Sequence, residues 1–125
     1  MVSGMDNETR HPEISVVLPT RNRAEILGRA LDSVLSQDLE SFEVIVVDDG
    51  SCDSTAKMVD GYHDTRIHYV STVHVGVSRA RNIGIEHAVG RRVTFLDSDD
   101  YVEQGWLRAL AGEQGEGIFD AAFVG

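Results

Sequence analysis

Four short apolar segments recur along the chain, and a segment with helical spacing follows each of them. Residues 14–18 and 42–47 are nearly continuous runs of β-branched and other apolar residues, typical of strands that are covered on both faces. Residues 66–70 and 92–96 predict two further strands, the first of them at an edge of the sheet. Because strands that alternate with helices form βαβ units with right-handed crossovers, the sequence predicts an α/β domain with a mostly parallel sheet flanked by helices.

Helix boundaries are predicted from capping residues and from the spacing of apolar side chains. Asn22 and Glu25 have the spacing of a capping box. Ser78 and Gly90 suit the N-cap and the C′ position of a later helix. Trp106 is expected to pack in the core. The predicted helices span about residues 22–35, 53–62, 78–89 and 103–110, and a short apolar stretch at 119–124 ends the chain.

Length and cysteine content favour one domain in a reducing compartment. The 125 residues, 42% of them hydrophobic, suffice to bury a core without disulfides. Residues 1–13 are polar and predicted to form a flexible tail, which leaves 14–125 as the domain. The single cysteine, Cys52, has no partner for an internal disulfide. Neither a membrane span nor a signal leader is recognisable. We therefore expect a cytoplasmic protein, whose full-length form gains any membrane association from other segments.

The charge of the chain argues against one class of partner. The formal net charge is −10, from 21 acidic and 11 basic residues, and no basic cluster stands out. Nonspecific nucleic-acid binding depends on neutralising phosphates with basic groups, so nucleic acid is not an expected partner. An anionic small molecule is still compatible with this charge, because a metal ion, a few arginines and backbone N–H groups can converge locally.

Polar residues follow three of the predicted strands at the point where each strand ends. These are residues 19–23, 48–51 and 97–100. The carboxyl ends of parallel strands meet at one edge of a sheet, and ligands of open α/β folds bind outside that edge. The sequence therefore predicts one ligand site that is built from these three segments.

The third of these segments has the pattern Asp-x-Asp. If the extended conformation continues past the strand, Asp97 and Asp99 point the same way and share one space. Two close carboxylates repel each other unless a cation neutralises them, and Mg²⁺ or Mn²⁺ prefers oxygen ligands and often adds substrate phosphates to its shell. This pattern indicates a metal–diphosphate site, although such acids can also simply solvate a strand end or cap the next turn.

The other two segments and a later helix start offer supporting groups. Asp49 can accept a hydrogen bond from a base N–H or a sugar hydroxyl, but Asp-Gly is also a strong turn former. Unpaired N–H groups near Arg21 can meet an anion or a base, and a simple helix cap is the alternative. Arg79 and Arg81 can serve a diphosphate or form only an exposed helical face.

Taken together, four segments resemble the nucleotide-binding part of family 2 glycosyltransferases, which have the Rossmann-like GT-A fold. The matching segments are residues 15–23, 46–55, 76–84 and 95–100. They occur in the order of the family, and the resemblance extends over about residues 14–110.

The resemblance implies roles for individual residues in binding the nucleotide. Pro19, Thr20 and Arg21 would line the base pocket. Asp49 would accept a hydrogen bond from the base, which is usually uracil in this family. Arg21 stands where the family commonly has an aromatic or small residue.

The resemblance also implies a metal site and a reaction. Asp97 would contact the ribose or support the metal shell, and Asp99 would ligate Mn²⁺ or Mg²⁺ that bridges the diphosphate. Arg81 would assist. The enzyme would be of the hexosyltransferase type, and transfer of the sugar to the acceptor would invert the anomeric centre by direct displacement.

The catalytic base of the family comes from a later acidic motif that this sequence does not contain. We therefore expect a C-terminally truncated part that binds a nucleotide-sugar donor and transfers sugar poorly or not at all. The carbohydrate, lipid or other acceptor would bind to the missing part, and an unpaired edge near residues 119–124 could allow a homodimer. The alternatives are a nucleotidyltransferase, which usually has a Gly-rich loop after the first strand, and a noncatalytic nucleotide-binding or scaffold module.

Overall fold

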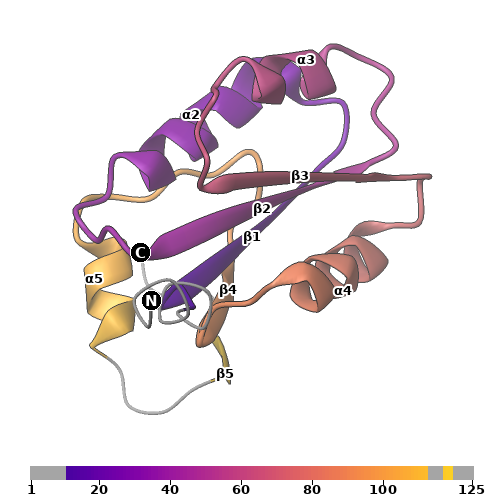
Figure 1. The fold of residues 1–125 in the computed structure, drawn as a ribbon. Helices are drawn as coiled ribbons and strands as arrows, with labels where there is room; N and C mark the ends of the chain where they lie inside the picture. The colour runs from indigo at the N-terminus through magenta and orange to yellow at the C-terminus, as the bar shows by residue number, and fades with distance from the viewer. Residues whose placement is uncertain (1–10, 113–116, 120–125) are drawn as a thin grey trace, which may run out of the picture.

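The computed structural model describes residues 11–112 and 117–119 and contains one parallel sheet with the strand order β3-β2-β1-β4-β5 (Figure 1). Helices alternate with the strands along the chain, as the sequence predicts, and β3 lies at one edge of the sheet. The elements are β1 Ile14–Thr20, α2 Ala24–Leu35, β2 Phe42–Asp49, α3 Thr55–Asp60, β3 Ile67–Thr72, α4 Val77–His87, β4 Arg92–Phe95, α5 Trp106–Ala111 and β5 Gly117–Phe119.

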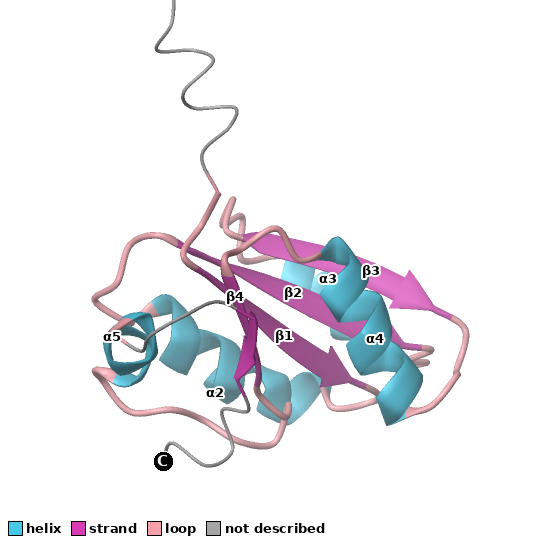
Figure 2. Ribbon diagram, turned by 90° about the horizontal axis from the view of Figure 1, so that it is seen from below, coloured by secondary structure: helices cyan, strands magenta, loops and turns pink. Residues whose placement is uncertain are grey.

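The two faces of the sheet are covered by different helices. In Figure 1, α2 and α3 lie above the sheet and α4 lies below it, and Figure 2 shows α4 against the opposite face from α2. Alternate residues of β1 and β2 supply the two cores, because side chains of a strand point to opposite faces in turn. Val16 and Val44 pack with α2, α3 and α5, whereas Val17 and Ile45 pack with α4. Trp106, at 5% exposure, belongs to the first core as predicted.

The central strand β1 continues through Pro19, where the sequence analysis ended it. It pairs with β2 as far as Thr20 but with β4 only as far as Val17. The carbonyl of Val17 accepts a hydrogen bond from Leu96 on the β4 side, so the nitrogen of Pro19, two residues later, also faces that side. Since β4 has ended there, the missing N–H of Pro19 breaks no ladder bond. The strand order also reverses between β1 and β4, so a gap opens at this edge.

The predicted capping box is wrong. Arg23 is the N-cap residue of α2, and its side chain makes no capping hydrogen bond; the N–H of Ala24 instead donates to Asp53 Oδ2 at 3.2 Å. Asn22 has a φ of 54° and its Oδ1 accepts a hydrogen bond from the N–H of Cys52 at 2.7 Å. A tertiary contact to the next loop has therefore replaced the local cap.

The predicted ends of α4 are also corrected. Gly76, not Ser78, is the N-cap residue, and its φ of 98° favours glycine. The helix stops at His87, so Gly90 is not its C′ residue. Gly90 is needed for a close approach instead, because a Cβ there would lie 2.5 Å from the Oγ of Ser15.

The ends of the described chain differ from prediction as well. Pro12 and Glu13, assigned to the tail, already make backbone hydrogen bonds to Arg91, Arg92 and Ser41. The last helix begins at Trp106, after Gly105 with a φ of 89°, and not near residue 103. The predicted apolar edge at 119–124 lies outside the described residues apart from Phe119. No helix among the described residues has the length and apolar character needed to cross a bilayer.

Candidate functional site

A cleft of about 390 Å³ opens at the carboxyl edge of the sheet, where β1 and β4 separate. The three acids on which the predicted site depends, Asp49, Asp97 and Asp99, all line it. The other lining residues come from the end of β1, the loop into α2, the start of α4 and the turn after β4: Pro19, Thr20, Arg21, Arg23, Val77, Ala80 and Ser98.

The Asp-x-Asp segment forms a turn and does not extend β4. The strand ends at Phe95, and the N–H of Asp100 donates to the carbonyl of Asp97 at 3.0 Å. The carboxylates of Asp97, Asp99 and Asp100 can each offer an oxygen within 4.8 Å of the others. The expected meeting of Asp97 and Asp99 therefore occurs, but the turn causes it and strand alternation does not. The turn also adds Asp100.

Two arginines from opposite sides of the cleft neutralise part of this negative charge. An Nη1 of Arg23, from the start of α2, lies 3.0 Å from Asp99 Oδ2. An Nη2 of Arg81, from α4, lies 3.2 Å from Asp97 Oδ1. The side chains in both pairs are 40–53% exposed, so each pair contributes little to the stability of the fold. Their position beside the acids is the informative feature.

Hydrogen bonds to α2 and to the residues just after it hold the turn at residues 97–100, here called the acidic turn, and the loop that follows it. Arg29 donates to the carbonyl of Asp99 at 3.3 Å, and its guanidinium lies 4.6 Å from the centre of the Tyr101 ring. Ser33 Oγ accepts from the N–H of Val102 at 3.1 Å. The buried amide of Gln37 donates to the carbonyl of Glu103 at 2.8 Å. The helix that begins at the cleft therefore also positions the loop that carries the acids.

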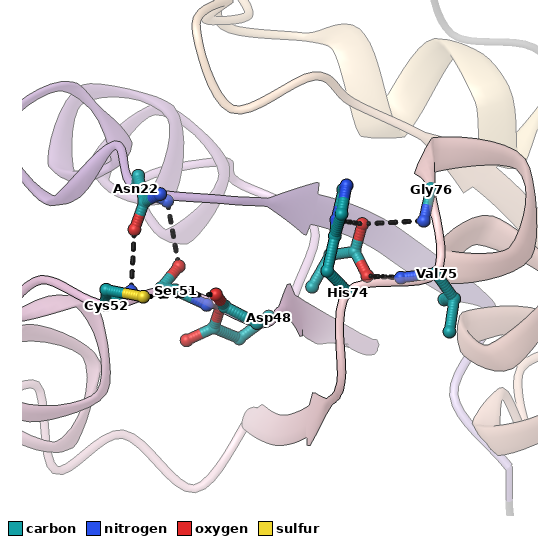
Figure 3. Close-up of polar contacts among 9 residues, drawn as sticks. Asn22, Asp48, Ser51, Cys52, His74, Val75 and Gly76 are labelled. Carbon is teal, nitrogen blue, oxygen red and sulfur yellow. Dashed lines mark hydrogen bonds and ion pairs between the residues drawn. The ribbon is translucent and has the colours of Figure 1, made fainter.

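Asp49 organises the segment that leads into α4. Its side chain is 6% exposed, and it accepts hydrogen bonds from the N–H groups of Val75 at 2.7 Å and Gly76 at 3.0 Å. The Nδ1 of His74 lies 3.0 Å from the same carboxylate (Figure 3). Burial acts to raise the pKa of Asp49, but the backbone hydrogen bonds and the His74 contact outweigh burial and lower it below 3.8. Asp49 is therefore an ionised anchor at the edge of the cleft.

Asp48 points to the other face and holds the turn after β2. Its Oδ1 accepts from the N–H of Ser51 at 2.9 Å, and its Oδ2 accepts from the hydroxyl of Tyr69. Burial and this bond raise the pKa of Tyr69. Ser51 Oγ in turn accepts from the N–H of Asn22 at 2.8 Å, which joins the loops after β1 and β2 (Figure 3). Two adjacent aspartates thus support two different walls of the site.

The donor set suits a hard divalent cation. Three carboxylates within 4.8 Å of one another can supply oxygen ligands of the kind that Mg²⁺ and Mn²⁺ prefer. A second observation also points to a ligand in this cleft. Thr20 is 4% exposed, and its hydroxyl has no hydrogen-bond partner within residues 11–112 and 117–119. A buried polar group of this kind usually has a partner, which a bound molecule can provide.

The structure brings together most of the residues that the sequence analysis selected. Pro19, Thr20, Arg21, Asp49, Asp97 and Asp99 line the cleft, and Arg81 contacts it through Asp97. Arg23, Ser98 and Asp100 were missed, although all three stand in segments that the analysis quoted. Nothing in the sequence indicates His74, because its contact with Asp49 depends on the path of the loop between β3 and α4. The individual roles of these residues stay predictions.

Comparison with known proteins places the chain in a family. Residues 15–125 match the profile of glycosyl transferase family 2. The chain is 38% identical, over 85% of its length, to the GalNAc(5)-diNAcBac-PP-undecaprenol beta-1,3-glucosyltransferase of Campylobacter jejuni. It is 37% identical, over 78% of its length, to glycosyltransferase GlyA of Streptococcus pneumoniae.

Solved structures agree. S. aureus TarS 1-349 in complex with UDP-GlcNAc superimposes with a TM-score of 0.76 at 34% identity, over 79% of this chain. Mannosyltransferase PcManGT from Pyrobaculum calidifontis, in complex with GDP-Man and Mn²⁺, superimposes with a TM-score of 0.73 at 31% identity, over 82% of this chain.

All four proteins are longer than this chain, which spans 36% of the Campylobacter enzyme and 14% of GlyA. It spans 30% of the TarS structure and 32% of the mannosyltransferase structure. The family match nevertheless covers residues 15–125, which contain β2 to β5 and all of β1 except Ile14. The chain belongs to glycosyl transferase family 2 and has the Rossmann-like GT-A fold of the nucleotide-binding part.

Proposed function

We propose that this chain is the donor-binding part of a hexosyltransferase that binds a nucleoside-diphosphate sugar, with uracil as the expected base, together with Mn²⁺ or Mg²⁺. The observation that carries the proposal is the convergence of Asp49, Asp97 and Asp99 on one cleft at the switch between β1 and β4. Related structures in complex with UDP-GlcNAc, and with GDP-Man and Mn²⁺, support it.

The residues of the cleft divide into a nucleotide end and a diphosphate end. Pro19, Thr20 and Arg21, with Asp49 beside them, would contact the nucleoside, where the hydroxyl of Thr20, which has no partner among the described residues, is available to it. The carboxylates of the acidic turn, Asp97 and Asp99 first, would hold the cation. When bound, the cation supplies Lewis-acid stabilisation of the charge that develops on the departing nucleoside diphosphate.

Transfer itself depends on more than this cleft. By analogy with the family, the sugar would move with inversion to a carbohydrate, lipid or other acceptor, and we assign the general base to no residue of this chain. The expected weak or absent turnover, cytoplasmic location and homodimer all stay predictions. Turnover on this chain at the rate of a complete glycosyltransferase would contradict the first of them.

Calorimetry with UDP tests the proposal, in the presence of Mn²⁺ and in the presence of a chelator. Wild-type protein should bind UDP with Mn²⁺ and bind it more weakly by about tenfold without metal, as expected when a charge-neutralising ligand is removed. Asp99→Asn should lose the effect of Mn²⁺. Asp38→Asn is the matched control, because Asp38 is also exposed and paired with an arginine, at 3.2 Å, but lies outside the cleft.

Each outcome separates one part of the proposal from another. Equal UDP affinity with and without metal would remove the cation from it. Tighter binding of GDP than of UDP would change the base and keep the donor site. No binding of either nucleotide would favour a scaffold, whereas release of pyrophosphate from a nucleoside triphosphate would favour a nucleotidyltransferase.

A further inference from the structure

The two arginines beside the acidic turn are held in different ways. Arg81 has a second contact besides Asp97, because its guanidinium lies 5.8 Å from the centre of the Phe95 ring. The side chain of Arg23 is 45% exposed, and within the described part of the chain its only ion pair is with Asp99. Arg23 is therefore the cation that can leave the acids at the lower cost.

We propose that Arg23 is an exchangeable counter-ion of the acidic turn: it neutralises Asp99 in the cation-free protein, and a divalent cation displaces it toward the anionic oxygens of the bound diphosphate. This inference rests on the proposed function, since it requires both ligands to use this cleft. It assigns to Arg23 a role in coupling the two ligands.

Charge is the first argument for exchange. Three carboxylates lie within 4.8 Å of one another, and Arg23 and Arg81 each contact one of them. A divalent cation at these oxygens repels a guanidinium 3.0 Å from Asp99 and competes with it for the same carboxylate. Arg23 and the cation therefore oppose each other at Asp99.

The location of Arg23 is the second argument. It lines the cleft, so its side chain remains near any bound diphosphate after it leaves Asp99. Its backbone stays fixed, because its carbonyl accepts hydrogen bonds from the N–H groups of Ile26 and Leu27 in the first turn of α2. The helix does not use the Arg23 side chain as a cap. Exchange thus requires only a rotation of one exposed side chain, a motion of picoseconds to nanoseconds.

The energetic consequence is cooperation between the two ligands. In the absence of nucleotide, the cation must displace Arg23 and binds more weakly for that reason. A diphosphate gives the displaced guanidinium a new partner, so nucleotide binding strengthens cation binding, and by linkage the reverse holds equally. Removal of Arg23 should therefore tighten binding of the cation alone and reduce its cooperation with nucleotide.

The test compares wild type with Arg23→Gln and measures Mn²⁺ affinity from the electron paramagnetic resonance signal of free Mn²⁺, without nucleotide. Calorimetry then measures UDP affinity at saturating Mn²⁺. Arg108→Gln is the matched control: it removes the same charge from an exposed pair with Asp38, at 3.2 Å, outside the cleft.

Arg23→Gln should bind Mn²⁺ alone about two- to fivefold more tightly, the range expected for loss of an exposed ion pair, and bind UDP more weakly than wild type. Arg108→Gln should match wild type in both measurements. Unchanged or weaker Mn²⁺ binding by Arg23→Gln, with wild type binding normally, overturns the exchange and leaves the proposed function intact. The absence of Mn²⁺ binding by all three proteins, even with UDP, overturns both.

Discussion

Each end of β2 carries a buried carboxylate that accepts hydrogen bonds from the backbone, but only one of the two lines the cleft. Glu43 at the start and Asp49 at the end have side chains that are 7% and 6% exposed. Glu43 accepts from the N–H of Val89, just after α4, whereas Asp49 accepts from Val75 and Gly76, just before it. One strand therefore holds both ends of α4.

The difference between these ends lies in what closes them. At Glu43, Ser15 Oγ donates at 2.6 Å and itself accepts from the N–H of Gly90, where no Cβ fits. At Asp49, β4, which lies on the far side of β1, has already ended, and the carboxylate lines the cleft. Each carboxylate also contacts a half-exposed histidine, His68 or His74. The same anchoring chemistry thus serves packing at one end and a binding site at the other.

The largest expected effect comes from a substitution at Glu43, at the start of β2, where the carboxylate is enclosed by packed residues. Glu43→Ala leaves the N–H of Val89 and the hydroxyl of Ser15 without their acceptor and should lower the free energy of unfolding by about 3 kcal/mol. Urea unfolding measures this loss. UDP affinity of the folded protein should stay within about twofold of wild type, because Glu43 is remote from the cleft.

Glu43→Gln is the control for this substitution. Its amide keeps the size of the side chain and one acceptor oxygen, so the loss should be about 1 kcal/mol. A loss of nucleotide affinity equal to that of an Asp49 variant would mean that the two ends are not functionally distinct.

The next largest effect is expected from a substitution at Asp49, at the end of β2 that borders the cleft. Asp49→Ala frees the segment at residues 74–76 that borders the cleft, so calorimetry with Mn²⁺ should show UDP affinity reduced by about tenfold, the equivalent of one lost anchoring interaction. Its free energy of unfolding should fall less than that of Glu43→Ala, because solvent in the cleft can reach the freed N–H groups. Loss of stability with unchanged UDP affinity would show instead that Asp49 only anchors α4.

The smallest expected effect is on how the free energy of unfolding depends on pH below about 4. The pKa of Asp49 lies below 3.8 in the folded protein, so its ionised form stabilises the fold above that value, and this contribution is lost as the pH falls through the folded-state pKa. Asp49→Asn cannot titrate, and its free energy of unfolding should fall less steeply than that of wild type between about pH 4 and pH 2. Parallel curves for the two proteins in urea unfolding would refute the assignment.

Strands and faces could be predicted because their causes are local. The continuous apolar run in β2 requires burial on both sides, and all of its residues are buried. The ends of elements were predicted less well, because tertiary contacts decide them. Asn22 could cap α2, yet it binds Cys52 in the neighbouring loop. Gly90 could end α4, yet its place is set by Ser15.

The site followed the same division. Acids at the ends of parallel strands had to share one edge, and Asp49, Asp97 and Asp99 do line one cleft. Local pattern could not show that residues 97–100 turn, which brings in Asp100, or that Arg23 reaches Asp99. These contacts depend on the direction in which separate loops leave the sheet, and that direction is set by packing on α2 and α4.

Pro19 has a consequence for the durability of the cleft. If residues 97–100 became extended, β4 would lengthen alongside β1, and further pairing of the two strands would close the cleft. Pro19 offers no hydrogen to such a growing ladder, so that collapse lacks its next bond. A proline in the central strand thus disfavours closure of the cleft by further pairing of β1 with β4.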